Sequence, residues 1–219
     1  MHYTIKNLNN INEQIKSTTI KFKVNKVPQV IAVSKTFKLE SILPLIEYGH
    51  SHFGENKVQE ALEKWSEIKT KKNNLNLHLI GRLQTNKVKY AVKIFDYIHS
   101  VDSEKLAKKI SEEQVKQNRS VKLFIQVNVG NEEQKSGISV DALLGLYNYC
   151  TKLGLNIIGT MCIPPMNQNA ETSFKIMNNL NLKLGLKDLS MGMSSDYIQA
   201  IKNGSTYIRI GSNIFGPRD

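Results

Sequence analysis

The sequence predicts an α/β protein that folds as a single eight-stranded (β/α)8 TIM barrel with an extra N-terminal helix. Eight short apolar runs alternate with helical segments along the 219 residues, and such alternation implies parallel strands joined by helical crossovers. Eight units favour a closed barrel. We expect one domain over 1–219, with the helix at about 3–18 and the barrel at about 28–216, because no linker divides the chain. A doubly wound open sheet is the alternative, since one misassigned strand would change the topology.

The first half of the chain predicts one amphipathic helix followed by four strand–helix units. Ile5, Leu8, Ile11 and Ile15 recur at helical spacing and define the opening helix. Pro44 interrupts the pattern of the next helix. Strands are expected at 30–36, 50–53, 75–80 and 96–101. Helices are expected at 39–48, 58–68 and 87–93 and after Asp102 or Ser103, either of which can cap its helix.

The second half repeats the alternation with four more strands. These are expected at 121–129, 155–163, 188–191 and 206–210. A polar loop at 131–137 precedes a helix for which Ser139 is the expected cap, and two later helices are expected around 174–184 and at 195–202. The sequence given ends soon after the eighth strand, so we expect the opening helix to supply the missing outer helix.

The composition favours a small anionic ligand over nucleic acid. The formal net charge is +11, but only four of the thirty basic residues are arginines. The lysines are scattered over nearly every predicted helix and are not interleaved with aromatic residues, as a nucleic-acid groove would require. We therefore expect no nucleic-acid binding and a solvated, lysine-rich surface.

Cysteine content and hydropathy indicate a cytoplasmic protein that does not enter a membrane. The two cysteines, Cys150 and Cys162, make a disulfide scaffold improbable. No apolar run reaches the length of a membrane span, and residues 1–12 lack the apolar core of a signal peptide. A monomer is expected, because no long apolar stripe marks an obligate interface.

Lys35 is the first candidate functional residue. It ends the apolar run that begins at Val30, and this pattern predicts a buried strand that delivers one amine to the rim of the sheet. In a (β/α)8 barrel the chemistry lies at these carboxyl ends of the strands. Lys35 alone is compatible with a solvated end of a strand or with a functional amine.

Two glycine- and serine-bearing segments predict a phosphate site. Residues 191–196 read M-G-M-S-S-D and residues 209–216 read R-I-G-S-N-I-F-G, each directly after a predicted strand. Backbone N–H groups at such turns bind phosphate, and the loops after strands seven and eight are the usual phosphate site of a barrel. Tight turns without a ligand are the alternative interpretation.

Together these features predict a site for pyridoxal 5′-phosphate. Lys35 could form an imine with the aldehyde of this cofactor, and the two turns could bind its phosphate. Arg209 could approach the pyridine nitrogen, and an arginine stays protonated. As a donor it would keep that nitrogen unprotonated and weaken the cofactor as an electron sink, so the site could hold the cofactor while catalysing little.

Several stretches carry a more specific resemblance. They are A-V-S-K-T, F-G-E-N-K-V-Q-E, H-L-I-G-R-L-Q-T-N-K, Q-V-N-V, K-S-G-I, L-S-M-G-M-S-S-D and Y-I-R-I-G-S-N-I-F-G-P-R, in this order between Val30 and Arg218. In these motifs the chain resembles the pyridoxal phosphate homeostasis protein family. Members of that family are similar to the N-terminal barrel domain of alanine racemase and lack its second, β-rich domain.

The resemblance implies roles for eight residues. It implies that Lys35 is the Schiff-base lysine and that Arg209 faces the pyridine nitrogen. The residues it places around the phosphate are Ser194, Ser195, Gly211 and Ser212, and those it places in or near the pocket are Asn56 and His78. The implied function is to hold pyridoxal 5′-phosphate and to act in vitamin B6 and amino-acid homeostasis, with apo-enzymes as possible acceptors and no catalytic residue.

The alternative function is a pyridoxal phosphate-dependent racemase or a related enzyme. Racemisation with two bases needs a second acid–base group, and the related racemase carries its own on the domain absent here. A Schiff-base aldolase is a weaker alternative, because such enzymes place their lysine later in the barrel. No metal site is expected at His50 and His52, since no third ligand has suitable spacing.

Three further residues have other expected roles. Cys162 is expected to pack in its strand, and Asp196 is expected to lie at the start of its helix. For Glu55 the sequence leaves open whether it orients its neighbours or is an ordinary surface carboxylate.

Overall fold

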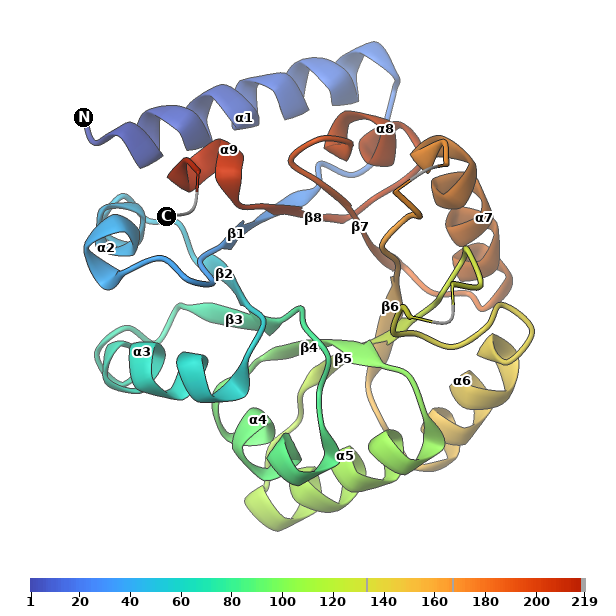
Figure 1. Cartoon of the computed structure of the whole chain (residues 1–219). Coiled ribbons are helices and arrows are strands. Elements are labelled where there is room, and N and C mark those ends of the chain that lie inside the picture. Colours follow the sequence, from blue (N-terminus) through green and yellow to red (C-terminus); the bar gives the residue numbers. More distant parts are fainter. Residues whose placement is uncertain (133, 167, 218–219) are drawn as a thin grey trace.

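The computed structural model describes residues 1–132, 134–166 and 168–217, in which eight parallel strands close into a barrel surrounded by helices (Figure 1). The strands pair in sequence order, and the first strand also pairs with the last. This confirms the closed barrel and excludes the open sheet. The strands are β1 (Gln29–Val33), β2 (His52–Glu55), β3 (Asn76–Leu79), β4 (Tyr97–Val101), β5 (Lys122–Gln126), β6 (Ile157–Met161), β7 (Asp188–Met193) and β8 (Tyr207–Ile210).

The helices lie outside the strands and bury their apolar faces against them. Buried Ala61 and Trp65, for example, lie four residues apart on one face of α3. The helices are α1 (Tyr3–Lys21), α2 (Leu39–Glu47), α3 (Val58–Lys71), α4 (Val88–Ile94) with the 3-10 turn η1 (Thr85–Lys87) before it, α5 (Glu104–Gln117), α6 (Leu143–Lys152), α7 (Ala170–Lys183), α8 (Tyr197–Lys202) and α9 (Ser212–Phe215).

Helix α1 covers the junction between the beginning and the end of the barrel. Figure 1 shows it lying beside α8 and α9, outside β1 and β8. The Asn7 side-chain amide donates to the Ile214 carbonyl at 3.0 Å, and the Tyr3 hydroxyl donates to the Phe215 carbonyl at 3.3 Å. The opening helix therefore covers β1 and β8 from the outside, together with α8 and α9.

Two local expectations need correction. Ser139 does not cap the helix that follows it, because Ile138 forms a β-bridge with Val127 and residues 139–142 make a turn, so that α6 begins only at Leu143. The second strand was expected at 50–53 but begins at His52. The strand continues through Gly54 to Glu55, because Gly54 pairs with Val33 of β1 and with His78 of β3. Ser103 does cap α5, accepting a hydrogen bond from the Leu106 N–H at 3.3 Å.

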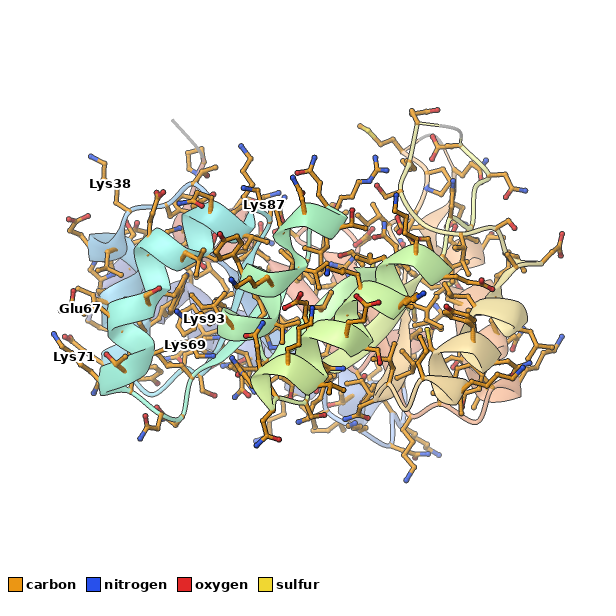
Figure 2. All side chains as sticks on the ribbon, turned by 90° about the horizontal axis from the view of Figure 1, so that it is seen from below. Lys38, Glu67, Lys69, Lys71, Lys87 and Lys93 are labelled. Atoms are coloured by element: carbon orange, nitrogen blue, oxygen red, sulfur yellow. The ribbon has the colours of Figure 1, made fainter. Side chains whose placement is uncertain are left out.

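Charged side chains occupy the outer surface (Figure 2). Lys38 and Lys93 are exposed, and Lys71 forms an ion pair with Glu67 at 2.6 Å on the outside of α3. Among the residues that the structure describes, no helix combines the length and the apolar character that crossing a bilayer requires. Glu133 of the expected polar loop, and Arg218 at the end of the last motif, lie outside the described residues.

Candidate functional site

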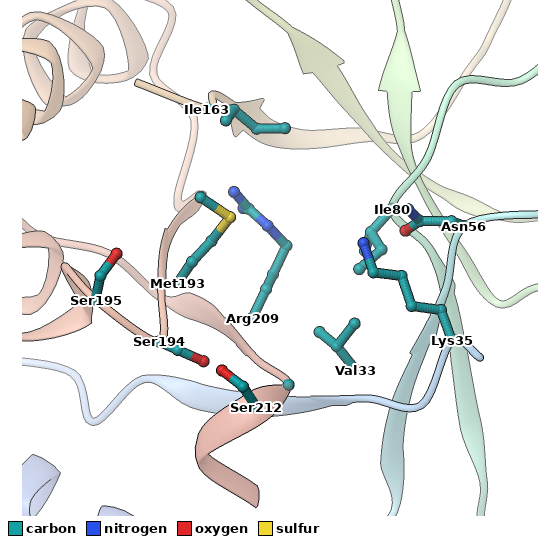
Figure 3. Close-up of a pocket in the computed structure, with 11 residues that line it drawn as sticks. Val33, Lys35, Asn56, Ile80, Ile163, Met193, Ser194, Ser195, Arg209 and Ser212 are labelled. Carbon is teal, nitrogen blue, oxygen red and sulfur yellow. The ribbon is translucent and has the colours of Figure 1, made fainter. Parts of the chain in front are cut away.

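A pocket of about 360 Å³ opens at the carboxyl ends of the strands (Figure 3). Seven of the eight predicted site residues line it, and His78 does not. Sequence reasoning missed its apolar wall, which carried no chemical signal. The residues that line it are Val33, Lys35, Asn56, Ile80, Ile163, Met193, Ser194, Ser195, Arg209, Gly211 and Ser212.

Strand β1 brings Lys35 to the pocket. Residues 30–34 are buried, Lys35 is half-buried, and Thr36 is exposed, so the chain leaves the core at the lysine. Thr36 adopts a φ of 67°, a left-handed conformation that is unfavourable for a β-branched residue. Its N–H donates to the Glu60 carboxylate of α3 at 2.7 Å. This contact fixes the backbone turn directly after the lysine.

Glu55 anchors the residue before Lys35 from inside the molecule. Its Oε1 accepts hydrogen bonds from Ser34 Oγ at 2.8 Å, from Trp65 Nε1 at 3.0 Å and from Lys64 Nζ at 3.0 Å. Lys64 also donates to the Ser34 carbonyl at 2.9 Å. Burial raises the pKa of Glu55, while the contacts with Trp65, Lys64 and Ser34 oppose that shift. Of the two interpretations that the sequence left open, the structure therefore supports the orienting one.

Asn56 reaches the pocket because a glycine packs against its backbone. Gly81 follows β3 with Ile80 between them, and it lies so close that a Cβ there would overlap the Asn56 carbonyl oxygen. The absence of a side chain at this position lets the loops after β2 and β3 meet. Asn56 itself is half-buried at the pocket wall (Figure 3).

The two glycine-bearing turns meet on the opposite side of the pocket. Ser194 and Ser195 follow β7, whereas Gly211 and Ser212 follow β8, and the hydroxyl groups of Ser194 and Ser212 face one another (Figure 3). The Asn213 side chain donates to the Ser194 carbonyl at 3.0 Å and so ties the turns together.

The backbone near the end of β7, directly before the first turn, requires a glycine. Gly192 has a φ of 90°, and a Cβ there would lie 2.5 Å from the Ala200 Cβ of α8. Asp196 occupies the N-cap position of α8, as expected, but its carboxylate turns back and accepts from the Met193 N–H at 2.6 Å. The glycine and this contact together fix the loop that carries Ser194.

Arg209 enters the pocket from β8 with most of its side chain buried. It is 4% exposed, and its guanidinium donates to Ser190 Oγ at 2.8 Å and to the Cys162 carbonyl at 2.9 Å. An arginine has five N–H donors, so these bonds fix its plane without exhausting its donors. Cys162 is buried, and burial raises the pKa of its thiol to about 12, in agreement with the expected packing role.

His78 lies one layer below the pocket. It comes two residues before Ile80, which directly follows β3 and lines the pocket, and it is fully buried inside the barrel. Its imidazole hydrogen-bonds to His52 at 2.9 Å and to His99 at 3.0 Å. His78 therefore lies on the expected strand, but its side chain is not among those that line the cavity.

His50 and His52 do not converge on a common point. His50 Nε2 bonds to the His52 carbonyl at 2.8 Å, while the His52 ring turns toward His78. In the described ranges no group of three or more histidine, cysteine, aspartate or glutamate side chains is placed to hold a metal ion.

Comparison with known proteins gives one consistent result. The model of the family described as "Alanine racemase, N-terminal domain" matches residues 7–219. The pyridoxal phosphate homeostasis protein of Aquifex aeolicus is 39% identical over 200 residues, 87% of either chain. That of Haemophilus influenzae is 36% identical over 225 residues, which cover 97% of this chain and 95% of the relative. The chain belongs to the pyridoxal phosphate homeostasis protein family.

A solved structure of a relative supports the same assignment. PipY of Synechococcus elongatus, in a structure with pyridoxal phosphate bound, superposes with a TM-score of 0.81 and 34% identity, covering 94% of this chain and all of the other. Its structure without the cofactor superposes with a TM-score of 0.84. The barrel described above is therefore the family fold.

Proposed function

We propose that this protein binds pyridoxal 5′-phosphate in the pocket at the carboxyl ends of the strands and holds it as a Schiff base with Lys35. The observation that carries this proposal is the placement of Lys35, buried Arg209 and the two small-residue turns around one cavity. The cavity of about 360 Å³ is in the usual size range of small-molecule sites. The names of the relatives and the cofactor bound in PipY support the same ligand.

The pocket residues fit the parts of this cofactor. Ser194, Ser195, Gly211 and Ser212 lie on the turns that would hold the phosphate through hydroxyl and backbone N–H donors. Arg209 would offer its remaining N–H groups to the ring nitrogen, and Asn56 would contact the cofactor from the wall that also carries Ile80. Once bound, the cofactor supplies an aldehyde that reacts with amines and a ring that withdraws electrons.

We infer that the protein stores and delivers the cofactor rather than catalysing an amino-acid reaction. Among the described residues that line the pocket, the titratable side chains are Lys35 and Arg209. A guanidinium does not deprotonate under physiological conditions, so it is a poor proton acceptor. Racemisation with two bases requires a second acid–base group, and this wall does not provide one. The role would be in vitamin B6 and amino-acid homeostasis, with apo-enzymes as acceptors.

The proposal includes a monomer in the cytoplasm. The cytoplasm is supported by the two cysteines, which are free and buried, as a reducing compartment allows. Sedimentation of the protein loaded with cofactor would test the oligomeric state, and a stable dimer would contradict the proposed monomer.

The experiment that tests binding is borohydride reduction of the loaded protein followed by peptide mapping. We expect an imine absorbance band and a reduced adduct on Lys35. Lys35→Ala should lose both, whereas Lys57→Ala, at an exposed lysine beside Asn56, should retain them. An adduct on another lysine would overturn the assignment.

The racemase alternative is tested separately. The loaded protein is incubated with enantiopure alanine in deuterated water, and deuterium at the α-carbon is measured. Incorporation that depends on Lys35 would favour an enzyme, whereas none is expected for a carrier.

A further inference from the structure

A continuous chain of hydrogen-bonded side chains runs through the inside of the barrel and ends at Arg209. His52 Nδ1 contacts His78 Nε2 at 2.9 Å, and His78 Nδ1 contacts His99 Nε2 at 3.0 Å. His99 Nδ1 contacts Ser190 Oγ at 2.9 Å, and this oxygen accepts from Arg209 at 2.8 Å. The five residues come from β2, β3, β4, β7 and β8, so the chain crosses the barrel from the N-terminal end of β2 to the pocket.

The middle of this chain is sealed from water and held rigidly. His78 and His99 are fully buried, as is Ser190. The His78 ring stacks on Tyr97 with centroids 4.1 Å apart, and the His99 ring stacks on Phe124 at 4.2 Å. These stacks fix the planes of both imidazoles. The nitrogen atoms therefore meet their partners with little freedom to turn away.

The imidazoles of the chain are neutral. Burial lowers the pKa of His78 and of His99 well below 6.5, and the positive charge of Arg209 lowers that of His99 further. Burial also lowers the pKa of His52 to about 4, with His50 and Lys122 as smaller contributors. A neutral imidazole has one N–H donor and one acceptor nitrogen. His78 and His99, which each have two neighbours in the chain, must therefore donate to one neighbour and accept from the other.

Arg209 sets the direction of donation, because a guanidinium only donates. Ser190 Oγ accepts its hydrogen bond and then has its own hydroxyl hydrogen to place. In the described part of the chain its side-chain partners are Arg209 and His99. With the hydroxyl donating to His99 Nδ1, every polar atom of Ser190 is satisfied. With the opposite direction, Ser190 would accept twice and its hydrogen would face no side-chain acceptor.

We propose that His99 and Ser190 are positioning residues for Arg209, and that His52, His78 and His99 all carry their hydrogen on Nε2. In this arrangement His99 donates to His78, and His78 donates to His52. The Ser190 oxygen is thereby turned toward Arg209, and the remaining N–H groups of the guanidinium point into the pocket. The link to the ring nitrogen of pyridoxal 5′-phosphate rests on the proposed function, whereas the tautomers belong to the protein alone.

The tautomers can be measured without cofactor. Two-bond ¹⁵N–¹H correlation spectra of the cofactor-free protein at pH 7 distinguish a histidine protonated on Nε2 from one protonated on Nδ1. We expect the Nε2–H form for His52, His78 and His99. An Nδ1–H form at His99 would overturn the proposed direction. This result does not depend on whether the protein binds the cofactor.

The positioning role is tested with Ser190→Ala and a matched control. Ser205→Ala also removes a buried hydroxyl, but Ser205 Oγ donates to the Met191 carbonyl at 2.7 Å and lies outside the chain. We expect Ser190→Ala to raise the Kd for pyridoxal 5′-phosphate tenfold or more, as for a lost hydrogen bond to a charged group. The control should stay near the wild-type Kd.

A spectroscopic readout separates positioning from general damage. With ¹⁵N-labelled cofactor bound, the ring nitrogen of wild type should show the shift of an unprotonated pyridine that accepts a hydrogen bond. In Ser190→Ala this shift should move, and in Ser205→Ala it should not. Equal Kd values and equal ring shifts in the two variants would overturn the proposal. Lack of binding by wild type would instead refute the proposed function and leave the tautomer result standing.

Discussion

Lowering the pH from 7 to 5 is expected to destabilise this fold, because the folded protein buries histidines whose imidazoles stay neutral. Burial lowers the pKa of His50 and of His52 from 6.5 to about 4, and those of His78 and His99 well below 6.5. Unfolding exposes these imidazoles, so below pH 6.5 the unfolded chain binds more protons than the folded one. The free energy of unfolding therefore falls as the pH falls from about 6.5 toward 4.

The magnitude follows from His78 and His99, which are fully buried. Each proton that the unfolded chain takes up in excess costs about 1.4 kcal/mol of stability per pH unit. Between pH 7 and 5, a histidine with an unfolded pKa of 6.5 that stays neutral in the folded state costs about 2 kcal/mol. The pair therefore accounts for about 4 kcal/mol, a large part of the about 5–15 kcal/mol that stabilises a typical domain. His50 and His52 are only half-buried, and they add to this.

The assay is urea unfolding at pH 7, 6 and 5, followed by the fluorescence of the single tryptophan, Trp65, which is fully buried in the native state. In His99→Gln the steepest slope of the unfolding free energy against pH should be smaller, by the equivalent of about one bound proton. Ser205→Ala should lower stability at every pH without changing that dependence, because it removes no titratable group. An unfolding free energy that is constant from pH 7 to 5, or an unchanged slope in His99→Gln, would refute the reasoning.

Three further substitutions test other parts of the structure. Glu55→Gln keeps an acceptor for Trp65 but removes the charge that faces Lys64, so urea unfolding at pH 7 should show a loss of about 1–3 kcal/mol, whereas the exposed Glu67→Gln should change little. Gly81→Ala places a Cβ against the Asn56 carbonyl and should weaken cofactor binding in a fluorescence titration; a wild-type Kd would contradict the packing described. Gly145→Ala, at an exposed position of α6 with open space for a Cβ, should raise the unfolding free energy by about 0.5–1 kcal/mol, and a decrease would show that the helix needs this glycine.

The barrel and most of the pocket could be predicted because their signals are local in sequence. The apolar run before Lys35 defines a strand and its end together, and the glycine and serine segments span the ends of β7 and β8. In a parallel barrel all such ends meet on one face. Residues at strand ends are therefore brought together by topology, whatever the details of their packing.

The polar contacts between distant strands could not be predicted in this way. Ser190 and His99 are 91 residues apart, and neither carries a motif of its own. His78 lies on the predicted strand, but the sequence pattern of a strand does not show how deep inside the barrel each of its residues lies. Glu55 likewise depends on Lys64 of α3, an ordinary lysine in the sequence. The error at Ser139 arose because a cap residue is equally compatible with a turn.

The seam at which β1 pairs with β8 has a consequence for the kinetics of this barrel. Lys35 follows β1, whereas Arg209 lies on β8, and Ile31 is paired with Arg209 across the seam. Because this pairing joins the most distant strands of the barrel, it closes the longest loop, and such contacts form late in folding. A ligand bound to both residues would bridge the seam and slow its opening.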